Sequence, residues 1–179
     1  GIANQMIEEF MLAANECAAR FAVERDLPFL FRVHEEPDAG RMDEYFAMLK
    51  ALGVPAQKPK RAVKPRDLQA ILKQAAGQPY ETAVNRVLLR SLKKARYCEE
   101  NLGHFGLAAK YYCHFTSPIR RYPDILVHRG IIAALKGGLH EKQLEAEHAR
   151  MPEMGRHTSE CERVAMEAER AVDDLKKTE

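Results

Sequence analysis

The stretch HFTSPIRRYPD (residues 114–124) organises the chain, because its residue types predict a short strand that leads into a helix. The aromatic and β-favouring residues of Tyr111–Phe115 are typical of a buried strand. Thr116 and Ser117 then offer hydroxyl groups that can cap a helix, and Pro118 fits its first turn. The pattern therefore predicts a helix that begins at Pro118.

Two arginines, Arg120 and Arg121, would lie in the first turn of this helix. Cations are disfavoured there, because the N-terminus is the positive end of the helix dipole. Free N–H groups, hydroxyls and guanidinium groups together form a binding site for phosphate. On physical grounds alone two interpretations stay open: a phosphate site, or two solvated arginines beside an ordinary helix cap.

The same stretch, continued by ILVHR (residues 125–129), resembles the signature of the RNB family, the ribonuclease II and ribonuclease R exoribonucleases. It is most similar to the ribonuclease R branch. Further matches follow in order along nearly the whole chain: IEEFMLAAN (7–15), LPFLFRVHEEP (27–37), LLRSLKKARY (88–97) and GHFGLAAKYY (103–112).

The resemblance implies a processive, hydrolytic 3′→5′ exoribonuclease. Such an enzyme degrades single-stranded RNA from a free 3′ end and releases nucleoside 5′-monophosphates. Residues 1–179 would be the C-terminal part of the RNB catalytic domain, without the upstream metal-binding part and without the flanking OB-fold RNA-binding domains. The alternative is a non-catalytic RNA-binding or protein-interaction module that holds phosphate at the same helix N-terminus.

The resemblance also implies roles for the charged residues of the signature. Arg120 matches the family's catalytic arginine, whose planar fork can pair with two phosphoryl oxygens as negative charge grows. Arg121 is expected to contact RNA or to pair with an acid. Asp124 follows Arg120 by four residues and could hold its guanidinium group, or it could simply compensate the helix dipole.

Four further residues are expected to support the site. In the family a glutamate of the EE pair reaches the sugar of the terminal nucleotides, and we assign this role to Glu8. Glu8 shares a helix face with Asn15, seven residues later, although the helix dipole alone would also favour a glutamate here. Thr116 and Ser117 are expected to cap the helix, to contact RNA, or both.

Magnesium is the cofactor that the resemblance implies. Mg²⁺ needs clustered carboxylates, but the aspartates are dispersed, at positions 26, 38, 43, 67, 124, 173 and 174. No CxxC pair or close histidine pair suggests another metal site. We therefore expect Mg²⁺ in the full-length enzyme, with ligands that are not in this chain, and no exonuclease activity of the chain alone.

The bulk composition is that of a globular protein, with 46% hydrophobic and 30% charged residues. The net charge is only +2, so RNA binding must come from a local site. No apolar run approaches the roughly 20 residues of a membrane span. We expect a monomeric cytoplasmic protein.

The remaining pattern predicts an α+β fold that is mainly helical, with helices packed on a few short strands of a mixed sheet, as a partial RNB fold. Helices are predicted at about 4–25, 37–52, 65–77, 78–92 and 118–135, then from 139 to a stop at Pro152, and finally from a cap at Thr158 or Ser159. Short strands are predicted at 29–34, 96–98, 107–112 and 111–115.

Overall fold

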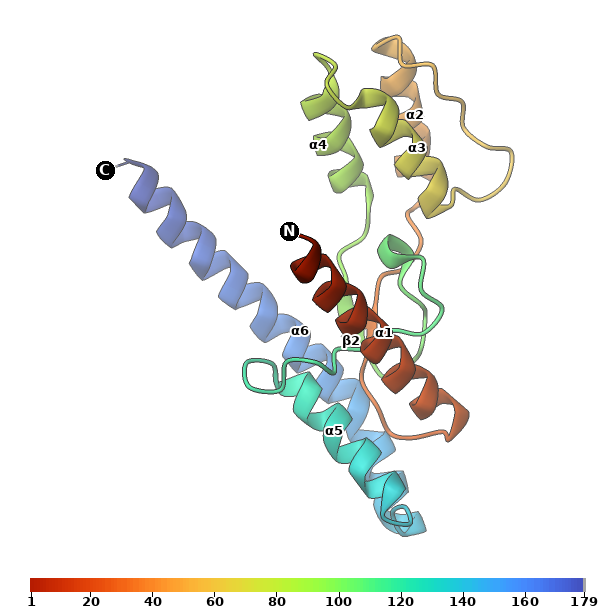
Figure 1. Ribbon diagram of the computed structural model, residues 1–179, viewed down its shortest axis with the longest axis vertical. Coiled ribbons are helices and arrows are strands. Elements are labelled where there is room, and N and C mark those ends of the chain that lie inside the picture. Colours follow the sequence, from red (N-terminus) through yellow and green to blue (C-terminus); the bar gives the residue numbers. More distant parts are fainter. Residues whose placement is uncertain (179) are drawn as a thin grey trace. The chain divides into compact units, whose positions relative to one another are not determined.

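The computed structural model describes residues 1–178 and divides into two compact units (Figure 1). Unit 1 consists of Gly1–Val33, Arg96–Leu102 and the chain from Lys110 onward. Unit 2 consists of His34–Ala95 and Gly103–Ala109. The signature stretch therefore lies entirely in unit 1.

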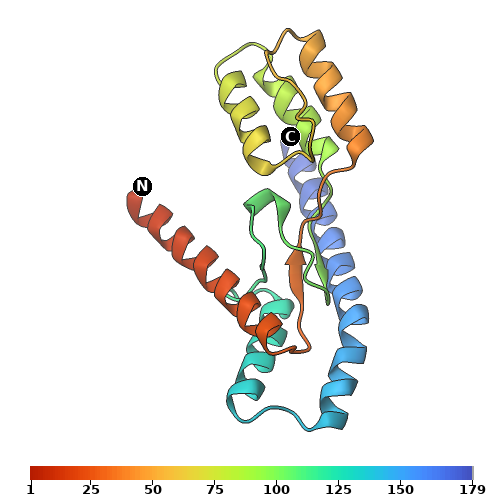
Figure 2. The same ribbon diagram turned by 90° about the vertical axis from the view of Figure 1, so that its right-hand side faces the viewer.

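Unit 1 packs three helices with a two-stranded sheet. The elements are α1 (Ile2–Glu24), β1 (Phe31–Val33), β2 (Arg96–Cys98), α5 (Tyr122–Leu135) and α6 (Glu141–Thr178). β1 and β2 pair antiparallel with Arg32 opposite Tyr97, α6 packs along β2, and α1 contacts α5 (Figure 2). The core combines small α1 residues with larger apolar ones: Ala18, Ala19, Ala22, Phe29, Phe31, Val33, Cys98, Cys113 and Val127.

Unit 2 packs three helices, α2 (Ala39–Ala51), α3 (Pro65–Ala75) and α4 (Glu81–Ser91), with a short 3₁₀ helix, η1 (Phe105–Leu107). Local signals start two of the helices. The Asp38 side chain accepts a hydrogen bond from the Arg41 N–H, and Asp67 accepts one from the Lys64 N–H. The Arg61 guanidinium group also bonds Asp67 and lowers the pKa of that carboxyl to about 2.

The α+β class with mainly helical content is confirmed, but the sheet is smaller than the sequence predicts. Within residues 1–178 the sheet is the antiparallel pair β1–β2, so the predictions of a mixed sheet and of strands at 107–112 and 111–115 are wrong. Instead of a β-ladder, residues 111–115 form separate hydrogen bonds. The Arg32 N–H donates to the Tyr112 carbonyl, and the Phe115 N–H donates to Asn15 Oδ1.

The helix of the signature begins four residues later than predicted. Residues 118–120 form a turn, Arg121 occupies the N-cap position, and α5 starts at Tyr122. The reason is Pro123. A helix that began at Pro118 would contain Pro123 in its sixth position, where proline removes a backbone hydrogen bond and clashes with the preceding turn. Arg120 and Arg121 therefore lie before the helix and not in its first turn.

The two helices predicted after Gly138 are one continuous helix, α6, with Pro152 inside it. The hydroxyls of Thr158 and Ser159 do not cap a new helix, because both donate to carbonyls of the preceding turn, including that of Gly155. Gly155 serves packing: a Cβ there would lie 3.1 Å from the Tyr97 carbonyl. Within residues 1–178 no helix is long and apolar enough to cross a membrane.

Candidate functional site

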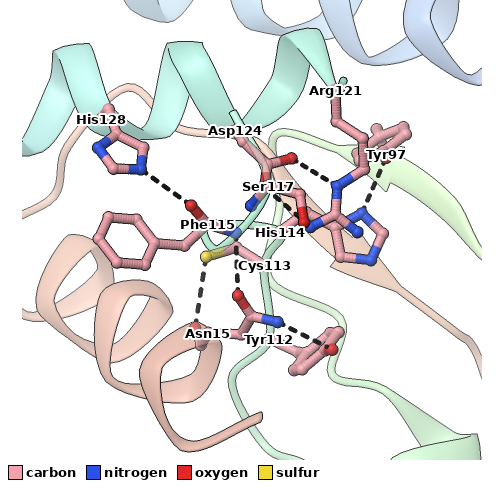
Figure 3. A network of polar contacts seen from close by, with 10 residues as sticks. All are labelled: Asn15, Tyr97, Tyr112, Cys113, His114, Phe115, Ser117, Arg121, Asp124 and His128. Atoms are coloured by element: carbon pink, nitrogen blue, oxygen red, sulfur yellow. Dashed lines mark hydrogen bonds and ion pairs between the residues drawn. The ribbon is translucent and has the colours of Figure 1, made fainter. Parts of the chain in front are cut away.

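The buried carboxylate of Asp124 fixes the turn of the signature (Figure 3). Its Oδ1 accepts hydrogen bonds from the Ser117 N–H at 2.7 Å and from Arg121 Nη2 at 2.8 Å, and its Oδ2 accepts one from Arg121 Nε at 2.9 Å. The side chain of Asp124 is fully buried and that of Arg121 is 18% exposed. A buried charge needs such a partner, so this pair and the turn form one structural unit.

Asn15 of α1 holds the segment before the turn in place, as Asp124 holds the turn itself (Figure 3). The Asn15 Oδ1 accepts from the Phe115 N–H at 3.0 Å, and its Nδ2 donates to the Tyr112 hydroxyl at 3.1 Å. The Cys113 thiol donates to the Asn15 carbonyl at 3.3 Å. Burial raises the pKa of the Cys113 thiol, which favours the neutral form that makes this contact. Asn15 thus joins α1 to the segment that leads into the signature.

The two histidines of the signature region bond to protein groups. His114 Nδ1 and the Tyr97 hydroxyl are hydrogen-bonded at 2.9 Å, and burial raises the pKa of Tyr97 to about 12. His128 Nε2 and the Phe115 carbonyl are hydrogen-bonded at 2.9 Å, and the two rings stack with centroids 4.2 Å apart. Both histidines support the structure around the signature (Figure 3).

An open groove of about 280 Å³ brings together four of the predicted site residues: Glu8, Asn15, Thr116 and Arg121. They come from α1 and from the signature, more than a hundred positions apart. The other residues that line the groove are Asn4, Ile7, Met11, Leu12 and Tyr112. The groove therefore has apolar walls with a carboxylate, a hydroxyl and a guanidinium group among them, a combination suited to a polar organic ligand.

Sequence reasoning missed Tyr112 as a groove residue and assigned it only to a strand. The spacing could have indicated it, because residues an even number apart in an extended segment lie on the same side, and Tyr112 precedes Thr116 by four positions.

The structure does not place the other predicted residues in the groove. Arg120 is exposed, is not among the lining residues, and within residues 1–178 its side chain has no hydrogen-bond or ion-pair partner. The predicted pairing of Arg120 with Asp124 is wrong, because Asp124 binds Arg121 instead. Ser117 contributes its backbone N–H to Asp124. Neither Thr116 nor Ser117 caps α5, since that helix begins at Tyr122.

The carboxylates of the described residues 1–178 do not assemble a metal centre. In the part of the chain that the structure describes, no group of three or more His, Cys, Asp or Glu side chains is placed to hold a metal ion. Asp124 is committed to Arg121 and to the Ser117 N–H. The described residues therefore do not fit Mg²⁺, which prefers octahedral oxygen ligands.

Comparisons with known proteins agree on one family. The RNB domain matches residues 1–137. Ribonuclease R 1 of Lactococcus lactis is 45% identical over 179 residues, which cover 100% of this chain and 22% of that protein. Ribonuclease R of Thermotoga maritima is 44% identical, with 100% of this chain and 25% of that protein covered. The chain thus spans about a quarter of the length of these relatives.

A solved structure shows the same fold. The apo form of Mycoplasma genitalium RNase R superposes with a TM-score of 0.90 at 26% identity, over 98% of this chain and 28% of that one. The same protein has also been solved in complex with ribose-methylated single-stranded RNA. The groove and the signature therefore lie in a fold that this chain shares with an RNase R.

Proposed function

Because this chain belongs to the RNB domain family, we propose that it forms part of a processive hydrolytic 3′→5′ exoribonuclease of the ribonuclease R type. Its substrate is single-stranded RNA with a free 3′ end, and its products are nucleoside 5′-monophosphates. The full-length enzyme acts as a cytoplasmic monomer. The chain contributes RNA contacts and an arginine that stabilises the transition state, as the C-terminal part of the catalytic domain.

The groove between α1 and the signature is the observation that carries this proposal. Residues expected to contact RNA on sequence grounds, Glu8, Thr116 and Arg121, line one groove although they are far apart in the chain. The buried side chains of Asn15 and Asp124 hold its walls through hydrogen bonds to the Phe115 and Ser117 N–H groups. Preorganised polar groups of this kind suit the binding of one strand of RNA.

Arg120 is the residue that we assign to the chemistry. Its fork is exposed and has no partner within residues 1–178, whereas the fork of Arg121 is occupied by Asp124. A free guanidinium group can pair with two phosphoryl oxygens. The hydrogen bonds of Asp124 fix the turn from which the Arg120 side chain extends, so the fork is free to close on a phosphoryl group.

The experiment that tests the function uses the purified full-length protein that contains this chain, with 5′-labelled single-stranded RNA. Because the proposed enzyme is processive, the full-length strand should be converted to a short 5′-labelled end product with few intermediates, and nucleoside 5′-monophosphates should be released. RNA binding without shortening would favour the alternative, a non-catalytic RNA-binding module. Internal cleavage products would contradict a 3′→5′ exonuclease.

We expect the isolated chain to show no Mg²⁺-dependent exonuclease activity. The reason is that its described residues offer no carboxylate cluster, and we propose that the Mg²⁺ ligands of the enzyme lie outside this chain. The measurement is nucleotide release from a 3′-labelled RNA with and without EDTA, beside the full-length protein as a positive control. Robust, EDTA-sensitive release by the isolated chain would contradict this expectation.

We expect Glu8→Ala in the full-length enzyme to reduce its preference for RNA over DNA. A carboxylate accepts a hydrogen bond from a ribose 2′-OH, which DNA lacks. Hydrogen bonds to charged groups correspond to roughly a tenfold to a hundredfold preference. Cleavage rates on matched RNA and DNA strands measure the effect, with Glu9→Ala as the control, since Glu9 is exposed but does not line the groove. An unchanged ratio for Glu8→Ala would remove Glu8 from the site.

A further inference from the structure

The side chain of Arg32 links the sheet of unit 1 to α6. Arg32 Nη1 donates to Glu162 Oε2 at 2.6 Å, and the two side chains are 14% and 30% exposed. Water and salt screen such a partly buried pair less than they screen a pair at the surface. Glu162 lies within α6, beyond the residues 1–137 that the RNB domain matches. A carboxylate outside the matched region therefore holds an arginine inside it.

The guanidinium group that Glu162 holds lies over the ring of Tyr97. The distance from Arg32 Cζ to the ring centroid is 4.7 Å, which is within the range of a cation–π interaction, and the two residues face each other across the β1–β2 pair. A second bond from α6 reaches the Tyr97 backbone, because its N–H donates to Ser159 Oγ at 2.9 Å. Glu162 and Ser159 together fix Tyr97 relative to α6.

From Arg32 and Tyr97, contacts continue to Tyr112 by two routes. The Arg32 N–H donates to the Tyr112 carbonyl at 2.9 Å. The Tyr97 hydroxyl and His114 Nδ1 are hydrogen-bonded at 2.9 Å, and the His114 ring lies edge-on to the Tyr112 ring with centroids 6.0 Å apart (Figure 3). Tyr112 lines the groove, and its hydroxyl accepts a hydrogen bond from Asn15. α6 thus supports a wall of the groove, although no described residue of α6 lines it.

The position of the Tyr112 ring depends on these neighbours. Tyr112 is 6% exposed, so the side chains packed around it confine its ring, and a displaced neighbour changes the shape of the groove at this wall. A groove that is fixed before its ligand arrives binds more tightly than one that must be ordered during binding. The contacts with α6 therefore matter for the ligand as well as for the fold.

We propose that Glu162 is a positioning residue for RNA, which acts through Arg32 and the contacts beyond it to hold Tyr112 where the groove fits one strand. This inference rests on the proposed function, because it takes RNA as the ligand of the groove. It gives α6, which lies outside the signature and outside the groove, a role in RNA affinity.

The test uses the full-length enzyme with Glu162→Gln, which removes the charge and keeps the shape, and with Tyr97→Phe, which removes the hydroxyl and keeps the ring. Kd for a single-stranded RNA is measured in EDTA, and KM and kcat for the same strand are measured with Mg²⁺. Substitutions along a chain of contacts change the coupling between two sites by about two- to thirtyfold. Each variant is therefore expected to raise Kd and KM by a factor in this range and to change kcat little.

The comparison of KM with kcat separates positioning from a merely structural role. Partial unfolding reduces the number of active molecules, so it lowers the apparent kcat and leaves KM unchanged. Because Glu162 and Tyr97 belong to one chain of contacts, the double variant should raise Kd by less than the product of the two single effects. Glu160→Gln is the matched control: Glu160 is an exposed glutamate of α6 that pairs with Arg163, and the Kd of this variant should equal that of wild type.

Unchanged Kd and KM, an equal effect of Glu160→Gln, or single effects that simply multiply would overturn the inference while wild-type activity upheld the proposed function. If Glu162→Gln does not fold, Tyr97→Phe decides, because it leaves the ion pair of Glu162 with Arg32 in place, and an unchanged Kd would then overturn the inference. If wild type binds RNA but does not degrade it, the proposed function fails, and the Kd values of the variants still decide the role of Glu162.

Discussion

Replacing Arg120 with alanine in the full-length enzyme is expected to lower turnover about a hundred- to a thousandfold, by analogy with the loss of one oxyanion-hole donor. Lysine at this position is expected not to restore turnover. The guanidinium fork is planar and can hold two phosphoryl oxygens, whereas an ammonium group is a point charge on a flexible stem. If Arg120 acts on the charged transition state, its loss lowers the rate more than it lowers RNA affinity.

The Arg120 prediction is measured by single-turnover cleavage and by RNA binding, both at one fixed salt concentration because phosphate contacts depend on salt. Arg129→Ala is the matched control, since Arg129 is an exposed arginine of α5 that does not line the groove. Arg121→Ala should lower the turnover of the folded molecules less than Arg120→Ala does. Near-normal turnover of the Arg120→Lys variant, or a larger loss of turnover at Arg121, would show that the two arginines are assigned wrongly.

Most helices could be predicted from the sequence because their start signals are local. Asp38 before α2 and Pro65 at the start of α3 act within one turn, and apolar spacing identifies the buried faces. The start of α5 was predicted wrongly because Pro118 also fits an N-terminal turn, although Pro123 in the sixth position of such a helix already argues for a later start. Pro152 predicts the end of a helix, yet α6 continues past Pro152 and packs on β2. Such tertiary contacts are not visible in local patterns.

The predicted start of α5 also determined which arginine was expected to pair with Asp124. A start at Pro118 pairs Arg120 with Asp124 at i,i+4, whereas the actual start at Tyr122 leaves Arg121 to bind Asp124 at i,i+3. Glu8 was assigned from the family resemblance and Thr116 from its position before a predicted helix, and the structure places both in one groove. The pairing of Glu162 with Arg32 could not be predicted, because the two residues lie 130 positions apart and tertiary packing alone brings them together.

The pairing of Arg121 with Asp124 should make Arg121 far more important for folding than an ordinary surface arginine. Arg121→Met would leave a fully buried carboxylate with the Ser117 N–H and no cation. Removing one partner of a buried ion pair typically costs about 3–5 kcal/mol, because the remaining charge has lost its water without compensation. We therefore expect Arg121→Met to lower the free energy of unfolding by an amount in this range.

Urea unfolding followed by far-ultraviolet circular dichroism measures this loss, since the chain is mainly helical and has no tryptophan. Arg163→Met on α6 is the control: Arg163 pairs with Glu160 and Glu167, but all three side chains are exposed, so the cost should stay below about 1 kcal/mol. In an Asp124→Asn background, Arg121→Met should lose most of its effect, because a neutral amide needs no cation. Equal losses for Arg121→Met and Arg163→Met, or an undiminished effect when Asp124→Asn is also present, would mean that the buried charge does not govern the stability of the turn.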